Sequence, residues 1–338
     1  MRVSSVAMTR TLDPARLPEL FDLQAWLAAT DGRRREVAAA IVGALGLDFE
    51  VDEEPAPEGP RRAPWQEWSG GPLADHYADL ATPARDSSWR IVHVPTGISF
   101  LVVPGGSFEM GLGAAEEGFF EGPAWLDSPH AAAAAESGEL ELLNDQKAWM
   151  RPLRTVRVAP FLLAEAPLVG AMLEALGVEL DPEAPRVFAG LEEVTYLTLD
   201  EAAEALAGSG LRLPSEAEWE YACRAGSRSL FFWGDAIPAA PNHEVNALGL
   251  AELGNHAELC ADGWHASYEG APTDGRAWAG VGRRRVARGG AAACYPWQGC
   301  GEWQLLMSAL RRPMDPEGDE IDNQVALRPA CDLPLTAG

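Results

Sequence analysis

The stretch from Arg212 to Gly226 reads RLPSEAEWEYACRAG, and it constrains the fold of this 338-residue chain more than any other. Pro214 cannot lie inside a helix, because it lacks an N–H group and clashes with the preceding turn. Ser215 and Glu218 have the spacing of a capping box, in which each side chain accepts a hydrogen bond from the other residue's backbone N–H. The sequence therefore predicts a short helix that begins directly after Ser215.

The predicted helix has one apolar face and a charged beginning. Glutamates in its early turns place negative charge where the helix dipole favours it, and Gly226 is the natural residue to end the helix. Three residues recur at i, i+3 and i+4 and should point into the core: Trp219, Ala222 and Cys223.

This stretch, followed by FFWGD, resembles the signature of the formylglycine-generating enzyme family, also called the sulfatase-modifying factor family. Further segments resemble strands of that domain over roughly residues 90–335, and they read LVVPGGSFEMG, RTVRVAPFLLAEAPLV, RVARGG and VALRPACDLP. The resemblance implies an α+β fold of the C-type-lectin-like kind, with a mostly antiparallel sheet, short helices and long loops.

The chain divides into a family-like domain at 90–335 and an N-terminal helical extension with a linker at 1–89. An apolar stripe predicts a first helix before residue 30, and Asp31 should cap a second helix that ends at Gly46. The Pro- and Glu-rich stretch after residue 52 is typical of a linker. Two arrangements stay open, a separate N-terminal unit and helices that dock on the main domain.

The beginning of the family-like domain predicts a β-hairpin. Arg90–Val103 alternates apolar and polar residues around a Thr-Gly turn. Gly105 and Gly106 follow it directly, and the pair is interpreted as the next turn.

Acidic residues outnumber basic residues by 51 to 26, which gives a formal net charge of −25. The negative electrostatic field of such a chain repels nucleic acid and anionic membranes, and it favours basic peptides or cations as partners. We therefore expect a protein or peptide ligand, and no nucleic-acid or membrane partner. No apolar run approaches the ~18 residues of a membrane span. An odd number of cysteines and the lack of a signal-peptide pattern favour a reducing, cytoplasmic location.

Cys294 and Cys300, in GGAAACYPWQGCGEW, are the candidate catalytic residues. Two thiolates suit a soft ion such as Cu(I). The resemblance implies that such a pair binds copper, where family members use O2 to oxidise a substrate cysteine to formylglycine. Cys294 matches the first family cysteine, whereas Cys300 falls one residue late, and Trp303 stands in the second position when counted from the C-terminal side. Free thiols or a loop disulfide are the alternatives.

Several groups that position the substrate in the family are replaced here. Ala291 stands where the family has serine, and residues 301–304 read Gly-Glu-Trp-Gln instead of the family's Arg-Tyr-Arg stretch. We therefore predict a ligand- or protein-binding effector module without standard sulfatase-activating activity, and the alternative is a copper-dependent oxidoreductase. The candidate contact residues of the binding module lie in the same loop: Trp297, Glu302 and Trp303.

Glu252, Asn255 and Glu258 form the candidate metal site. The resemblance implies structural calcium in this segment, and carboxylate and amide oxygens suit such a hard cation. The alternative is that these residues hold the loop through hydrogen bonds without a metal.

Overall fold

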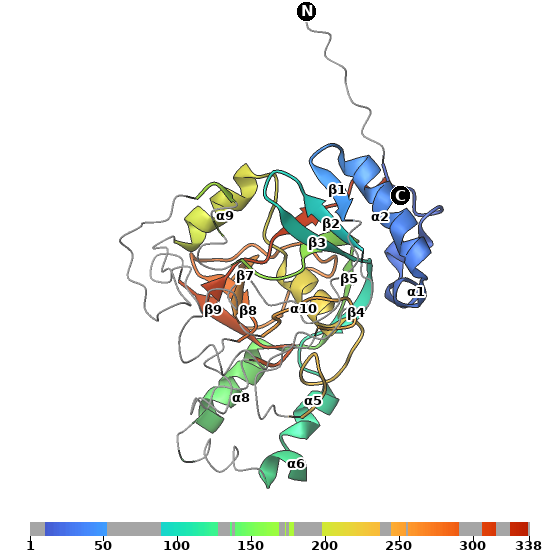
Figure 1. Cartoon of the computed structure of the whole chain (residues 1–338). Helices are drawn as coiled ribbons and strands as arrows, with labels where there is room; N and C mark the ends of the chain where they lie inside the picture. Colours follow the sequence, from blue (N-terminus) through green and yellow to red (C-terminus); the bar gives the residue numbers. More distant parts are fainter. Residues whose placement is uncertain are drawn as a thin grey trace, which may run out of the picture.

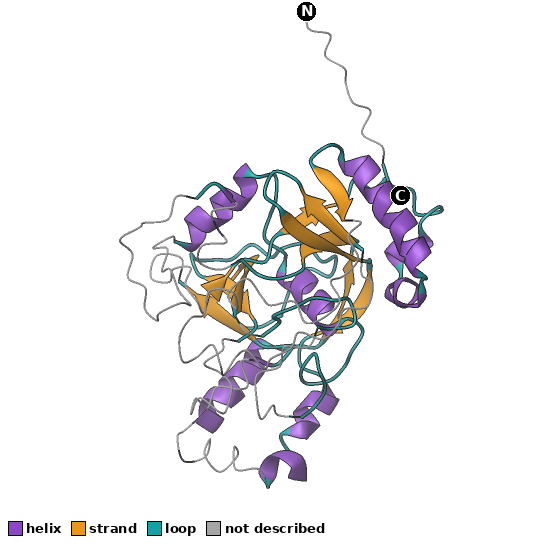
Figure 2. Cartoon of the chain, in the orientation of Figure 1, coloured by secondary structure: helices purple, strands orange, loops and turns teal. Residues whose placement is uncertain are grey.

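The computed structural model describes eleven parts of the chain: residues 11–52, 89–127, 136, 139–168, 173, 176–178, 198–236, 245–254, 256–290, 306–315 and 325–336. Within these ranges three sheets lie around one central helix, α10 (Figure 1). Figure 2 shows the strands gathered near this helix and the other helices farther out.

The largest sheet has five strands in the order β1-β2-β3-β6-β11, and every neighbouring pair is antiparallel. All four residues of the inner strand β6 are buried. The predicted first hairpin is confirmed, because β2 and β3 pair directly. The strands span Phe49–Asp52 (β1), Arg90–His93 (β2), Ile98–Val103 (β3), Phe161–Ala164 (β6) and Ala330–Asp332 (β11).

A second sheet has the order β10-β7-β8-β9, with β10 parallel to β7 and the other pairs antiparallel. Its strands are Val325–Ala326 (β10), Ala257–Gly263 (β7), Arg285–Arg288 (β8) and Arg311–Met314 (β9).

The third sheet consists of β4 (Gly106–Met110) and β5 (Arg154–Val158), which are antiparallel. Gly106 is thus the first residue of a strand, and the interpretation of the glycine pair as a turn is wrong for Gly106, whereas Gly105 lies between β3 and β4. Pro160 separates β5 from β6, and the two strands belong to different sheets. Proline supplies no N–H to a sheet, which is consistent with the break at this position.

α10 (Glu216–Arg224) has the predicted capping box, and all nine of its residues are buried. The side chain of Ser215 accepts from Glu218 N at 3.1 Å, and the side chain of Glu218 accepts from Ser215 N at 2.7 Å. Trp219 is 2% exposed, so the predicted inward face is confirmed. The helix ends one residue earlier than predicted, because Ala225 already adopts a left-handed conformation.

The outer helices lie at the periphery, with α9 on one side of the strands and α5, α6 and α8 at the bottom of the view (Figure 1). α9 carries a capping box formed by Thr198 and Glu201. No helix in the described ranges is both long and apolar enough to cross a membrane. The outer helices are α5 (Ala114–Phe119), α6 (Pro123–Leu126), α8 (Glu139–Trp149) and α9 (Leu199–Gly208).

The N-terminal helices dock on the main domain, which is the second of the two arrangements considered. They are η1 (Pro18–Phe21), α1 (Leu23–Ala28) and α2 (Asp31–Leu45). α2 contacts β1 and β2, and β1 extends the five-stranded sheet at its edge. Leu12 N donates to Pro334 O at 2.8 Å, which ties the two ends of the described chain together.

The caps of these helices differ slightly from the prediction. Thr30, not Asp31, is the N-cap of α2, and its side chain accepts from Arg33 N. Asp22 interrupts the predicted first helix, because it has an extended backbone and caps α1 through Ala25 N.

Candidate functional site

A buried charge network on one side of α10 supports the base of the predicted cysteine loop. Arg288 Nη2 lies 2.6 Å from Glu220 Oε2, and its Nη1 lies 3.1 Å from Glu216 Oε1. Arg311 Nε lies 2.8 Å from the same Glu216 oxygen, and the Tyr268 hydroxyl donates to that oxygen at 2.7 Å. Each of these charged groups is stabilised by a partner of opposite sign, which buried ions require.

Glu220 also receives charge-assisted contacts from the last turn of its own helix. Arg224 Nε lies 2.8 Å from Glu220 Oε1, and Arg224 Nη2 lies 2.9 Å from Glu116 Oε1. Burial acts to raise the pKa of Glu220, but Arg288 and Arg224 together hold that pKa below its ordinary value. The carboxylate is therefore ionised and fixed between two guanidinium groups.

Arg288 links the two sides of the loop at residues 291–305. It is the last residue of β8, and it donates to Ala309 O at 2.9 Å and to Ser308 O at 2.8 Å on the far side of the loop. A Cβ added to Gly290 would lie 2.6 Å from Leu306 Cδ2, so the chain segments that enter and leave the loop are in contact. The loop therefore starts and ends on one closed base.

The second side of this base is the segment predicted to hold calcium. Gly289 has φ of 76°, and a Cβ there would lie 2.7 Å from His256 O and 3.4 Å from Trp219 Cζ2. A Cβ on Gly290 would lie 3.0 Å from Gly254 O. Both glycines are needed for this close approach of three segments. The structure thus brings Gly289 and Gly290, which precede the cysteine segment, next to Gly254 and His256 of the predicted calcium segment.

Six of the predicted site residues lie outside the described residues, and their roles stay predictions: Cys294, Trp297, Cys300, Glu302, Trp303 and Asn255.

Glu258 is fully buried, and both of its oxygens are bonded. Oε1 accepts from Arg328 Nη2 at 2.7 Å, and Oε2 accepts from Arg328 Nε and from Trp219 Nε1, each at 2.6 Å. This arrangement favours the hydrogen-bonding alternative for Glu258. Glu252 lies in the same segment with φ of 58°. Among the described residues no group of three or more His, Cys, Asp or Glu side chains is placed to hold a metal ion.

The three described cysteines are packed in the core as free thiols. Burial raises the pKa of Cys223 to about 12 and that of Cys331 to about 11, and it raises the pKa of Cys260 well above the ordinary value. Because the thiolate is the reactive form, these cysteines are suited to packing and not to nucleophilic or metal chemistry.

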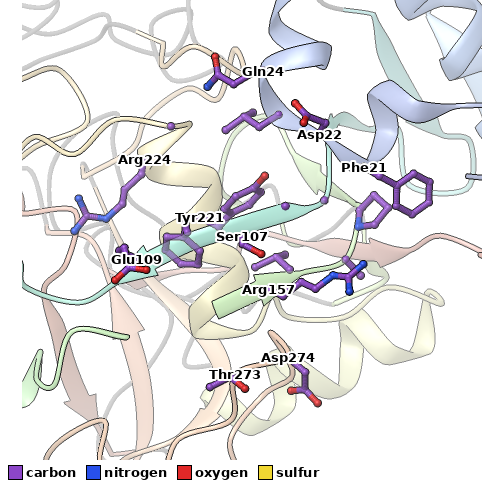
Figure 3. A pocket seen from close by; sticks show the side chains of 18 of the residues that line it. Phe21, Asp22, Gln24, Ser107, Glu109, Arg157, Tyr221, Arg224, Thr273 and Asp274 are labelled. Atoms are coloured by element: carbon purple, nitrogen blue, oxygen red, sulfur yellow. The ribbon is translucent and has the colours of Figure 1, made fainter. Parts of the chain in front are cut away.

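A cleft of about 1170 Å³ lies between the N-terminal helices, the β4–β5 sheet and the end of α10. Figure 3 shows Asp22 and Gln24 on one side of β4 and Arg157 on the other. This cleft could not be predicted from the sequence, because its walls come from segments far apart in the chain. The Gly105–Gly106 pair was a signal, since the cleft wall runs along both residues.

Tyr221 of α10 lines the cleft with a hydroxyl that has no hydrogen-bond partner within the described part of the chain. The side chain is 3% exposed and packs against Phe108, with 5.3 Å between ring centroids. A Cβ on Gly106 would lie 2.5 Å from this hydroxyl oxygen. Burial raises the pKa of Tyr221, and the charge of Asp22 raises it further, so the hydroxyl keeps its proton.

The geometry defines an α+β domain in which a buried charge network joins the two chain segments that flank residues 291–305. Residues 92–248 match the family model described as sulfatase-modifying factor enzyme 1-like domain. The resemblance seen in the sequence is thereby confirmed: this part of the chain is similar to the formylglycine-generating enzyme family.

The similarity to curated relatives covers parts of their chains. A formylglycine-generating enzyme of Streptomyces coelicolor is 27% identical over 176 residues, which is 43% of this chain and 54% of that protein. The enzyme of the same name from Mus musculus is 28% identical over 127 residues, 37% of this chain and 31% of that protein. A hercynine oxygenase of Mycolicibacterium smegmatis is 43% identical over 72 residues, 20% of this chain and 15% of that protein.

A solved structure shows the same fold. The structure of PvdO from Pseudomonas aeruginosa superimposes with a TM-score of 0.51 at 21% identity, covering 74% of this chain and 100% of that chain. The predicted fold, with its mostly antiparallel sheets and few short helices, is confirmed.

Proposed function

We propose that this chain is a binding or effector module on the family scaffold, that its ligand is a protein or peptide, and that it lacks standard sulfatase-activating activity. The observation that carries the proposal is the closed base of the cysteine loop. Arg288 bonds to Ser308 and Ala309, and Gly290 touches Leu306. A loop held at both ends by a buried ionic network is a suitable support for contact residues.

The composition of that loop supports recognition. Trp297 and Trp303 are aromatic residues of the type that carries much of the binding energy at protein interfaces, and Glu302 adds a charge that a basic ligand can pair with. The net charge of −25 favours association with basic partners. Ala291 and the Gly-Glu-Trp-Gln stretch replace groups through which family enzymes position their substrate.

The second candidate is a copper-dependent oxidoreductase that uses Cys294 and Cys300. Three curated relatives are named formylglycine-generating enzyme. The specific observation in its favour is that the other three cysteines are buried and held as thiols. Cys294 and Cys300 are therefore the candidates for thiolate ligands, and a thiolate pair suits Cu(I).

Copper titration separates the two functions. The reduced chain is titrated with Cu(I) against a competing chelator, and O2 consumption is followed with a cysteine-containing peptide. We expect weak uptake and O2 consumption equal to a blank. The oxidoreductase function would be supported instead by tight one-to-one copper uptake together with O2 consumption. In that case Cys294→Ser should abolish the copper uptake, and the control Cys331→Ala should preserve it.

Panning with displayed peptides tests binding by the loop directly. A phage library of random short peptides is selected against the immobilised chain, and the selected peptides are titrated with Trp297→Ala and Trp303→Ala variants. Peptides that lose affinity for either variant while its melting temperature stays unchanged support the proposal. Full affinity of all selected peptides for both variants would contradict it.

A further inference from the structure

We propose that the outer edge of β4, within the cleft, binds an extended segment of a basic polypeptide as an added β-strand. The described residues that line the cleft do not include those at either end of the cysteine loop, and the proposal goes beyond the function proposed for that loop. The proposal is based on the backbone of β4, the hydroxyl of Tyr221 and the charge around the cleft.

The register of β4 against β5 shows which way the backbone of Ser107 points. Ser107 lies opposite Arg157, and Arg157 N donates to Thr273 O at 2.8 Å on the side away from β4. In an antiparallel ladder, two opposite residues either exchange both hydrogen bonds or point all four groups outward. Ser107 N–H and C=O therefore point away from β5, toward the outer edge of β4.

The same edge is capped at both ends by this chain's own groups. Gly105 N donates to Leu20 O at 2.8 Å, and Glu109 O accepts from Arg228 Nη1 at 3.1 Å. These outward groups alternate with Ser107, as the period of two in a strand requires. Between the two capped positions, the backbone N–H and C=O of Ser107 have no bonding partner in the ranges that the structure describes. A peptide residue in extended conformation can bond to both, which is the contact made in β-strand addition.

Tyr221 supplies a second, independent observation at the same place. Its hydroxyl is buried beside Gly106, the neighbour of Ser107, and lacks a partner in the described part of the chain. In Figure 3 the ring points past β4 toward Asp22. A buried polar group without a partner carries a desolvation penalty that a bound polar atom removes. Like the backbone of Ser107, the hydroxyl is therefore a polar group beside this part of β4 that has no partner in the described ranges.

Charge favours a basic segment over an acidic one. Asp22, Glu109 and Asp274 line the cleft. The charge of Arg224 is offset by Glu116 and Glu220, and that of Asp274 by Arg276, which leaves two arginines against two carboxylates among the lining residues. The surrounding molecule carries a net charge of −25, which attracts cationic segments over a distance.

The test uses the full chain and random peptides displayed on phage, as above, with the selected peptides synthesised and titrated. Ser107→Pro removes the outward N–H but leaves the hydrogen bonds between β4 and β5 in place. It should therefore lower the affinity for the selected peptides about tenfold. Ser107→Ala, the matched control, keeps the backbone donor and should stay within about twofold. Peptides should be basic, should bind more weakly as salt is raised, and should lose affinity when one central N–H is methylated.

Tyr221→Phe separates ligand binding from folding. Removing a buried hydroxyl without a partner should leave the melting temperature unchanged or raised, whereas affinity should fall about fivefold. The proposal is overturned if the panning yields no peptide that discriminates Ser107→Pro from Ser107→Ala. It is also overturned if sedimentation shows that Ser107→Pro abolishes self-association, because the occupant is then a second copy of this chain. Peptides that respond to the Trp297 and Trp303 variants report on the loop, so the two proposals can fail independently.

Discussion

Arg288 Nη2 lies 2.6 Å from Glu220 Oε2, and both side chains are fully buried. Arg288 ends the strand before the cysteine loop, and Glu220 belongs to the central helix. The pair joins two elements that are separated by 68 residues in the chain. Removal of either charge leaves the other buried and without adequate compensation.

Glu220→Gln should therefore destabilise the chain by about 3–5 kcal/mol, the range for a broken buried ion pair. Urea denaturation measures the free energy of unfolding. The control is Asp274→Asn, which removes an exposed pair with Arg276 whose nitrogen and oxygen are 3.6 Å apart. Such surface pairs contribute about 0–1 kcal/mol. Equal effects of the two substitutions would contradict the assignment of Glu220 to a supporting network.

Trp219 contributes both packing and a hydrogen bond, and two substitutions separate them. Trp219→Ala should destabilise the chain by about 3–5 kcal/mol through the cavity it leaves. Trp219→Phe keeps most of the ring but removes the indole N–H that Glu258 accepts at 2.6 Å. Its effect should be about 1–3 kcal/mol, the range for a buried acceptor that loses its donor. A melting temperature that barely moves in Trp219→Ala would show that the helix is not buried as described.

Asp262 should make stability depend on pH near neutrality. Its Oδ2 accepts from Glu216 N at 2.7 Å and its Oδ1 from Trp278 N at 2.8 Å. Burial, with Glu216 nearby, raises its pKa to about 7. A carboxyl with a raised pKa binds its proton more tightly in the folded chain, so its contribution to stability is complete at low pH and is lost as the pH rises toward 7.

The difference between the wild type and Asp262→Asn isolates this effect, because the asparagine does not titrate. Between about pH 8 and about pH 4 the free energy of unfolding of the wild type should rise relative to the variant by on the order of 4 kcal/mol. Carboxylates with lowered pKa values, such as Glu220, act in the opposite direction and at lower pH. A flat difference across this interval would show that Asp262 is ionised throughout.

Local chemistry made the helices predictable. The capping boxes of Ser215 with Glu218 and of Thr198 with Glu201 join residues three apart, so their signal lies within a few letters of sequence. The cap of α2 differed by one position, because Thr30 and Asp31 are adjacent and both are good N-cap residues.

Long-range pairing could not be predicted in the same way. The glutamates of α10 suggest favourable interactions with the helix dipole, but the arginines that pair with Glu216 come from β8 and β9. The cleft joins Asp22 to Tyr221, which are far apart in the sequence, and no periodicity encodes that neighbourhood. The docking of the N-terminal helices, which the sequence left open, decides whether the cleft exists.

Chelation tests the calcium site proposed at Glu252, Asn255 and Glu258. An ion that binds the folded chain raises its melting temperature by mass action. Because Arg328 and Trp219 already bond both oxygens of Glu258, we expect the melting temperature to be unchanged in a chelator. A decrease that added calcium reverses and magnesium does not would establish the site, since magnesium demands a smaller octahedral shell.

Gly106 and Tyr221 should be energetically coupled, because a methyl group on residue 106 would lie 2.5 Å from the Tyr221 hydroxyl oxygen. Gly106→Ala should therefore destabilise the chain by about 1–3 kcal/mol through overpacking. In the double variant with Tyr221→Phe the nearest ring atom is 3.4 Å away, so most of the loss should be recovered. The control is Gly43→Ala, where nothing lies within 4 Å, and a helical alanine there should stabilise the chain by about 0.5–1 kcal/mol. Urea denaturation of the double-mutant cycle measures the coupling, and strictly additive effects would show that the hydroxyl is not seated against residue 106.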